Sequence, residues 1–139
     1  MASLTASKVV LGLAYYGRSF TLEDPKCNYP GCRYKSGGKP GGCSDIAGTL
    51  TNCEISETIR EYRLTPKLDP VAAVKMITWH DQWVAYDDDE TFKQKVTFAK
   101  SQCLGGTMVY NSLPIIRPRS ARFIWLMVLR VLVFRGLSM

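Results

Sequence analysis

The chain has 139 residues, 46% hydrophobic and 22% charged, which excludes a disordered polypeptide and leaves room for one ordinary domain. It is too short for a complete (β/α)8 barrel, which typically needs about 250 residues. Five arginines and no acid lie in residues 114–139, so residues 1–113 keep 13 of the 18 basic groups against all 12 acids. That near-neutral body gives no indication of nucleic-acid binding.

The first expected element is a buried strand over residues 8–16. Its sequence, Lys8-Val-Val-Leu-Gly-Leu-Ala-Tyr-Tyr16, is apolar and β-branched with little alternation. This pattern is typical of a strand covered on both faces, as in a parallel sheet. We expect Gly17 to end the strand. The apolar run Val9–Ala14 is shorter than the apolar core of a signal peptide, so no signal peptide is recognised.

Residues 23–48 are rich in glycine, proline and cysteine and predict a loop. Four of the five cysteines fall within 27 residues, a density that favours disulfides in a secreted protein; these disulfide candidates are Cys27, Cys32, Cys43 and Cys53. Zinc is the weaker alternative, because the sequence has no Cys-x-x-Cys pair and a single histidine. We expect neither a metal nor a cofactor. The odd cysteine count leaves one thiol free or paired outside this chain.

A helix is expected to follow this loop. Thr51-Asn-Cys-Glu54 fits a capping box, and Ile55, Ile59 and Tyr62 recur at the spacing of one helical face. We expect Pro66 to stop the helix.

Two short strands, Val71–Trp79 and Trp83–Tyr86, flank His80-Asp81-Gln82 and predict a hairpin.

A second helix and a last strand come next. Asp87-Asp-Asp-Glu90 supplies an N-cap and first-turn acids. The helical face carries Phe92, Val96, Ala99 and Cys103, and Gly105-Gly106 is expected to close the helix. Thr107–Tyr110 then reads as a short buried strand. A helix between two buried strands is what a βαβ crossover provides, with the module between them as an insertion.

Residues 114–139 form a divergent basic and apolar tail. Phe123–Phe134 is nearly all apolar, but twelve residues are too few to span a bilayer, which needs about 20. We therefore expect no clear membrane span and interpret the tail as not native to the fold.

Four segments in order resemble one known family. Lys8–Phe20, with its Leu-Gly…Tyr-Gly-Arg signature, resembles the seventh strand of glycoside hydrolase family 18 chitinases. The Cys/Gly/Pro stretch is similar to the family's insertion, especially in the fungal killer-toxin-like subgroup. Trp79–Asp88 with Thr91–Val96 resembles the end of that insertion and the seventh helix, and Cys103–Val109 the entry into the eighth strand. The match ends after Asn111.

The resemblance implies an α/β fold: a partial TIM (β/α)8 barrel, about the seventh and eighth strands, with a small α+β insertion subdomain at about residues 19–86. Residues 1–113 would be the C-terminal part of the catalytic domain, and 114–139 the tail. Because proteins of this family are extracellular, the resemblance also implies an extracellular location.

The resemblance also implies a chemistry. In this family the substrate's N-acetyl oxygen attacks the anomeric carbon, and a glutamic acid from an Asp-x-x-Asp-x-Asp-x-Glu motif protonates the leaving oxygen. None of the twelve acids here has that spacing. We therefore expect no catalytic residue in this chain and interpret Asp87–Glu90 as a helix cap.

Substrate-binding residues are implied more directly. Tyr16 and Arg18 would lie at the carboxyl end of the seventh strand, where barrel active sites form. Tyr110 replaces the family's tryptophan under the sugar, and aromatic faces stack on pyranose rings. The alternative is that Tyr15 and Tyr16 are core residues and that Arg18 braces the insertion. Residues of the predicted hairpin are interpreted as structural, with Trp79, Trp83 and Tyr86 in packing and His80 in the turn.

Three functional interpretations remain. The chain is a fragment of a chitinase that hydrolyses β-1,4-linked N-acetylglucosamine polymers, with chitin or chito-oligosaccharide as partner and the N-terminal part of the barrel supplied elsewhere. Alternatively, it is a non-catalytic, lectin-like chitin-binding module. As a third alternative it is a truncated product without function, because one βαβ unit cannot bury its apolar faces.

Overall fold

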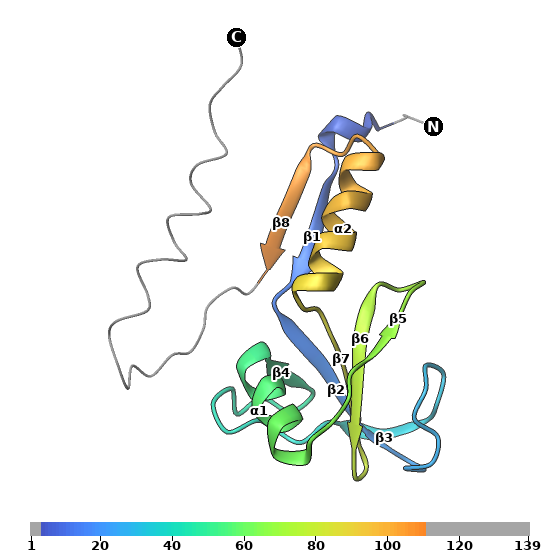
Figure 1. Cartoon of the computed structure of the whole chain (residues 1–139), viewed down its shortest axis with the longest axis vertical. Coiled ribbons are helices and arrows are strands. Elements are labelled where there is room, and N and C mark those ends of the chain that lie inside the picture. The colour runs from blue at the N-terminus through green and yellow to red at the C-terminus, as the bar shows by residue number, and fades with distance from the viewer. Residues whose placement is uncertain (1–3, 111–139) are drawn as a thin grey trace, which may run out of the picture.

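A computed structural model describes residues 4–110; the predicted tail at 114–139 lies outside the described residues. The described chain forms two sheets and two α-helices (Figure 1). The elements are the 3-10 helix η1 (Ala6–Lys8), β1 (Val10–Ala14), β2 (Tyr16–Leu22), β3 (Tyr34–Gly37), β4 (Thr49–Thr51), α1 (Asn52–Tyr62), β5 (Lys67–Asp69), β6 (Val74–Trp79), β7 (Gln82–Tyr86), α2 (Asp89–Ser101) and β8 (Gly106–Tyr110).

One sheet is the predicted parallel pair. β1 and β8 pair in parallel, from Val10 opposite Gly106 to Ala14 opposite Tyr110, and α2 leads into β8 (Figure 1). The prediction that these strands are buried is wrong for several side chains, because Val10 is 54% and Met108 51% exposed. Within residues 4–110 the two strands have only each other as sheet neighbours, which cannot cover both faces.

The second sheet holds six strands, in the order β3-β2-β7-β6-β5, with β4 also paired to β2. All of its pairings are antiparallel. A hydrophobic core joins the sheet to α1; it consists of Leu50, Ile55, Ile77, Val84 and Tyr86. The predicted hairpin is confirmed as β6 and β7, but β6 begins at Val74 instead of Val71, and Gln82 opens β7 instead of lying between the strands. The short strands β3, β4 and β5 were not predicted.

Gly17 does not end a strand, contrary to the sequence-based expectation. It lies inside β2, which continues to Leu22 with Tyr15 as the only residue between β1 and β2. Gly17 faces the core, where an added Cβ would meet Ile55 Cδ1 at 2.6 Å and Val84 Cγ2 at 2.7 Å. The residue is glycine because the helix packs against bare backbone there.

The capping box at α1 is confirmed, since the Thr51 side chain accepts from the Glu54 backbone N–H and the Glu54 side chain accepts from the Thr51 backbone N–H. The end of this helix differs from the prediction. α1 stops at Tyr62 because Arg63 adopts a left-handed conformation, so Pro66 lies beyond the stop.

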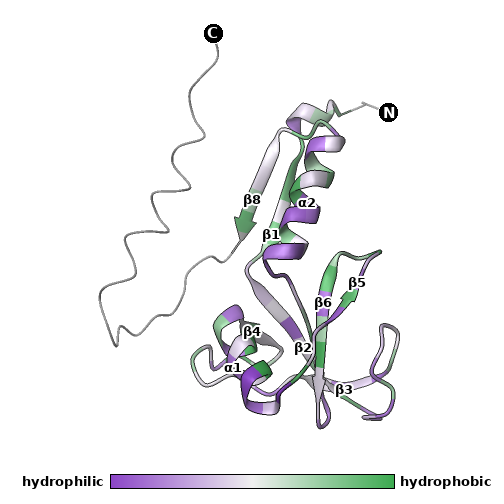
Figure 2. Cartoon of the chain, viewed as in Figure 1, coloured by the Kyte–Doolittle hydropathy of each residue, from purple (hydrophilic) through white to green (hydrophobic). Residues whose placement is uncertain are grey.

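α2 begins at the predicted acids, with Asp88 as N-cap, and its first turn is hydrophilic in Figure 2. Its end was predicted less well. Cys103, with φ 53°, takes the left-handed conformation after the helix, so Gly105-Gly106 does not close it. Gly105 is required for a different reason, because a Cβ there would collide with the carbonyl oxygen of Ser7.

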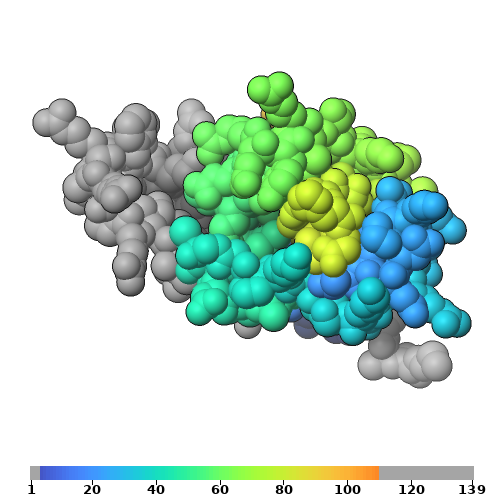
Figure 3. Space-filling model, turned by 90° about the horizontal axis from the view of Figure 1, so that it is seen from below, coloured from blue at the N-terminus to red at the C-terminus, as the bar shows by residue number. Residues whose placement is uncertain are grey.

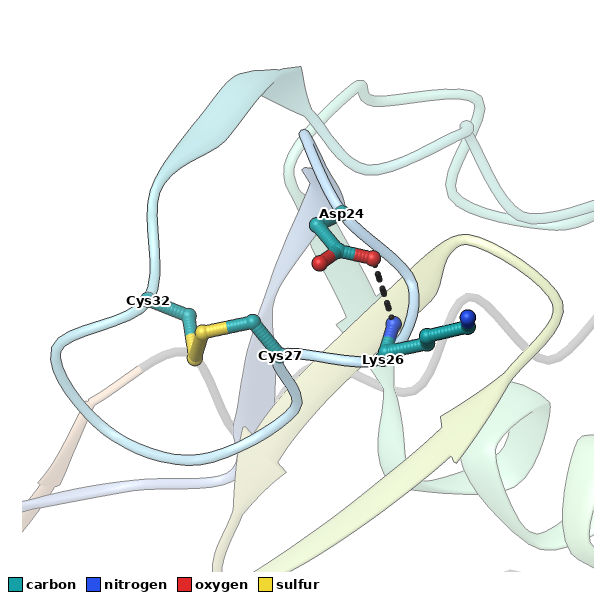
Figure 4. Close-up of a disulfide and its surroundings, with 4 residues drawn as sticks. All are labelled: Asp24, Lys26, Cys27 and Cys32. Carbon is teal, nitrogen blue, oxygen red and sulfur yellow. Dashed lines mark hydrogen bonds between the residues drawn. A yellow bond between two sulfur atoms is a disulfide. The ribbon is translucent and has the colours of Figure 1, made fainter.

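A disulfide joins Cys27 and Cys32 in the loop between β2 and β3 (Figure 4). In the same loop, the Asp24 carboxylate accepts the Lys26 backbone N–H at 2.9 Å. Cys43 and Cys53 are free and exposed, so one disulfide is present among the four candidate cysteines. No helix in the described part of the chain is long and apolar enough for a membrane crossing.

Candidate functional site

The candidate site lies where β1 and β8 end. Their last residues, Ala14 and Tyr110, are register partners, so the carboxyl ends of the parallel pair are side by side. Tyr16 follows two residues after β1 and opens β2. The backbone therefore brings Tyr16 and Tyr110, which are 94 positions apart in the sequence, to one end of the βαβ unit.

Arg18 and Tyr16 form a contact at this end. The Arg18 guanidinium carbon lies 5.1 Å from the centre of the Tyr16 ring, which is cation–π distance. Arg18 Nη1 also donates to Thr49 Oγ1 at 3.2 Å. Arg18 is exposed and Tyr16 half-buried, so the pair can meet a ligand from solvent. Aromatic faces stack on sugar rings, and the guanidinium retains donors for hydroxyl groups.

Sequence reasoning missed Thr49. It reaches the site because β4 pairs with β2 and places Thr49 opposite Arg18. No local signal indicates this, since β4 has three residues and its pairing joins segments 31 positions apart.

The strand pleat separates two faces of the larger sheet. Tyr16, Arg18 and Thr49 share one face, because alternate residues point the same way and register partners share a face. Gly17 and its partner Leu50 lie on the other face, which α1 covers. The candidate site is thus on the face away from α1.

Several other aromatic residues make packing contacts. Tyr15 is 42% exposed and stacks on Phe92 of α2 with ring centres 5.7 Å apart. The ring centres of Trp83 and Phe20 lie 6.0 Å apart, and Trp79 packs against the core. His80 adopts φ 50° in the β6–β7 turn.

The acids Asp87–Glu90 are engaged in structural contacts. Asp87 is buried and both of its carboxylate oxygens accept from the Lys95 ammonium group. Asp88 caps α2 and pairs with Lys75 at 2.7 Å, and Glu90 pairs with the same ammonium group at 2.8 Å.

Three carboxyl groups depart from their ordinary pKa, and in all three the pKa is lowered. Burial opposes the shift at Glu54, but hydrogen bonds from the Ser44, Thr51 and Cys43 backbone outweigh it. A hydrogen bond from Gln82 lowers the pKa of Asp81. At Asp88 burial is again outweighed, here chiefly by the hydrogen bond from Lys75. A general acid needs the opposite shift, so none of the three is suited to donate a proton at neutral pH.

Metal ligands do not gather in the described residues. No group of three or more histidine, cysteine, aspartate or glutamate side chains within 4–110 is arranged to hold an ion.

Comparison with known proteins identifies the family. The family model described as Glycosyl hydrolases family 18 matches residues 1–112. Mouse "Chitotriosidase-1" is 36% identical over 105 residues, which are 76% of this chain and 22% of that protein. The chain thus spans about a quarter or less of the length of such a relative.

Solved structures agree with this assignment. A Group IV chitinase of Ostrinia furnacalis in complex with allosamidin matches with a TM-score of 0.71 and 29% identity, over 76% of this chain and 28% of that one. Human YKL-39, described as a pseudo-chitinase with retained chitooligosaccharide binding properties, matches with a TM-score of 0.71 and 30% identity over the same shares. The chain therefore belongs to glycosyl hydrolases family 18.

Proposed function

We propose that this chain supplies part of a chitin-binding cleft and binds β-1,4-linked N-acetylglucosamine through Tyr16, Arg18 and Tyr110. The observation that carries the proposal is the Arg18 guanidinium over the Tyr16 ring at the end of the parallel pair. Support comes from two similar solved structures, a chitinase in complex with allosamidin and YKL-39 in the presence of chitooligosaccharides.

Hydrolysis is the activity we propose for a protein in which this unit is joined to the rest of a barrel. The substrate's own N-acetyl oxygen would attack the anomeric carbon there, and a glutamic acid would protonate the leaving oxygen. The 139 residues contain no Asp-x-x-Asp-x-Asp-x-Glu sequence, so this chain would contribute binding and positioning.

The apolar surface of the βαβ unit supports such a partner. Val10, Phe98, Met108 and Val109 are each 46% to 56% exposed, on β1, α2 and β8. Exposed apolar residues on a strand pair and its crossover helix are what neighbouring barrel strands and helices would cover. We propose that the remaining strands of the barrel pack on this surface.

Binding without turnover is the second candidate function. It is favoured by the similarity to YKL-39, a pseudo-chitinase with retained chitooligosaccharide binding properties. Both candidate functions include chitin binding. They differ in whether the rest of the protein provides the glutamic acid that protonates the leaving oxygen. The Cys27–Cys32 disulfide supports an extracellular location for either one.

The binding step is tested first, with the full chain and the N-acetylglucosamine hexamer in isothermal titration calorimetry. Arg18→Ala should weaken binding about tenfold, since it removes both the ring contact and the donor to hydroxyl groups. Arg33→Ala, another exposed arginine outside the site, should leave the affinity unchanged. Unaltered binding by Arg18→Ala would contradict the proposed site.

A chimera then separates the two candidates. Residues 8–110 replace the matching segment of mouse chitotriosidase-1, and release of reducing ends from colloidal chitin is measured. If the chimera releases reducing ends, and if the Arg18→Ala substitution in the chimera lowers that rate, the enzymatic role is supported. A folded chimera that binds chitin without turnover supports the second candidate.

A further inference from the structure

We propose a second carbohydrate site on the opposite face of the larger sheet, in a groove between α1, Trp79 and the loop at residues 39–42. Its ligand is a glucosamine unit, in which the amino group is free and positively charged, within a partly deacetylated chitin chain. The inference rests on the proposed function only in that the ligand comes from the same polymer.

The groove is separate from the first site. It has a volume of about 250 Å³, and its lining includes Trp79, Gln82 and Leu50. Trp79 and Gln82 are register partners, and Gln82 pairs with Thr21 of β2. Thr21 is three residues from Arg18, so the pleat places it on the other face of the sheet. A sugar unit bound in the groove therefore cannot also contact the Arg18–Tyr16 pair.

Figure 3 shows the surface on which these segments meet: the loop near residue 40, α1, and the turn near residue 80. The groove is smaller than the ~300–1,000 Å³ typical of sites for drug-sized ligands, so it suits one sugar unit. Lys39, Glu57 and Glu61 on its walls are exposed, which leaves the groove open for a polymer to enter and leave.

One wall of the groove is aromatic. The Tyr62 and Trp79 rings are stacked, with centres 6.5 Å apart and planes 27° apart. Tyr62 keeps 41% of its surface exposed, while Trp79 is fixed by packing against the core. A fixed aromatic surface beside a shallow groove suits the C–H face of a pyranose ring.

The α1 side of the groove also carries two acidic side chains. Glu57 and Glu61 are one helical turn apart, so they lie on the same side of α1. In the part of the chain that the structure describes, neither carboxylate takes part in a salt bridge. Two other charges on the walls are already engaged, because Lys39 lies 3.7 Å from Asp81 and the Glu54 carboxylate is taken up by backbone N–H groups.

The aromatic and acidic side chains of the groove together select the ligand. A neutral N-acetylated unit would use the aromatic surface alone, whereas a glucosamine unit places its ammonium group near two carboxylates that no salt bridge within residues 4–110 engages. Of the two, Glu57 accepts only the Cys53 thiol within that range, at 4.0 Å. A lysine side chain matches the charge, but it has no flat face for the aromatic wall. The geometry thus favours an amino sugar over a basic peptide.

Calorimetry with the full chain tests the site, with the fully deacetylated glucosamine hexamer as probe. The variant Glu57→Gln/Glu61→Gln keeps the side-chain shapes and removes both charges, and it should bind about threefold to tenfold more weakly. Glu23→Gln/Asp24→Asn removes two exposed charges elsewhere and should bind as the wild type does. Equal affinity of the Glu57/Glu61 variant and the wild type would overturn the proposal.

A spectroscopic readout identifies the aromatic wall. In protein with ¹⁵N-labelled tryptophan, the Trp79 indole signal, assigned with Trp79→Phe, should shift on adding the glucosamine hexamer. Absence of that shift, or equally tight binding of a lysine hexamer, would refute the amino-sugar assignment.

The two sites fail in distinguishable ways. Binding of the acetylated hexamer should depend on Arg18 and not on Glu57 and Glu61, and binding of the deacetylated hexamer should show the reverse. Loss of the first dependence alone overturns the proposed function, and loss of the second alone overturns the glucosamine site.

Discussion

The carboxylate of Glu54 accepts the backbone N–H of Cys43 at 2.7 Å, which ties the first turn of α1 to a loop eleven positions earlier. The same oxygen accepts from Ser44, and the other oxygen accepts from the Thr51 backbone. One buried side chain thus caps its own helix and fixes the preceding loop.

Replacing Glu54 with glutamine should lower the free energy of unfolding by about 1–3 kcal/mol. The amide would put a donor where the carboxylate accepts, leaving a buried N–H without a partner. Urea unfolding of the full chain measures the change. Glu57→Gln, one turn along the same helix and exposed, is the matched control and should change stability by less than about 0.5 kcal/mol.

The lowered pKa of Glu54 makes stability depend on pH in a defined direction. A carboxyl group with a lower pKa in the folded state stabilises the protein above its unfolded pKa, near 4.5, and this contribution is lost as pH falls through the folded value. Wild type should therefore lose stability below about pH 4.5, and Glu54→Gln should lose less over the same range. Parallel pH profiles of the two proteins would count against this account.

Gly17→Ala should destabilise the chain by about 1–3 kcal/mol, because the new methyl group overlaps the Ile55 and Val84 side chains. Gly12→Ala is the control, since that strand glycine has open space at its Cβ position. It should leave stability unchanged or raise it by up to about 1 kcal/mol. Thermal unfolding followed by circular dichroism compares the two, and similar losses for both would refute the packing argument.

Lys75→Met should loosen the connection between the larger sheet and α2. Hydrogen bonds to Asp88 and then Glu90 raise the pKa of Lys75, so its ion pairs persist through neutral pH and are lost only above the ordinary lysine range. We expect a loss of about 1 kcal/mol and faster amide exchange in the first turn of α2. Lys67→Met, an exposed lysine of β5, should change neither quantity.

Cys43 and Cys53 should form a second disulfide when the protein is produced in an oxidising compartment. Glu54 holds the Cys43 backbone beside the start of α1, and Cys53 immediately precedes Glu54. The Cys53 pKa is raised by burial, then by Glu57 and by the nearby Cys43. Peptide mapping without reduction should recover Cys43 linked to Cys53, with Cys103 alkylated.

The stability change gives a second check on this disulfide. A disulfide between Cys43 and Cys53 should raise the free energy of unfolding by about 2–4 kcal/mol. The variant Cys43→Ser/Cys53→Ser should lose this contribution. Cys103→Ser is the control and should keep it. Free alkylation of both Cys43 and Cys53 in unreduced protein would contradict the prediction.

Features encoded within a few residues could be predicted from the sequence. The capping box between Thr51 and Glu54 spans four positions, and the Asp88 cap lies directly before its helix, so both are local signals. The helix between two strands was likewise predicted from the pattern along the chain, and the parallel pairing of β1 and β8 confirms the βαβ crossover.

Features that depend on distant pairing could not be predicted. β4 and β5 have three residues each and are strands only because β2 and β6 lie beside them. The packing role of Gly17 needs Ile55 and Val84, which are 38 and 67 positions away. The position of Thr49 at the first site and the Tyr62–Trp79 contact at the second likewise depend on contacts between segments that are distant in sequence.

The larger sheet begins along the chain with β2 and ends with β7, and these two strands are antiparallel neighbours with Arg18 opposite Ala85. Its two ends therefore meet the βαβ unit next to each other. A module attached in this way can be cut out and its ends rejoined by a short turn, or moved as a block into another strand-to-helix loop. We therefore expect the sheet that carries both proposed sugar sites to be a portable unit for grafting binding surfaces onto other folds.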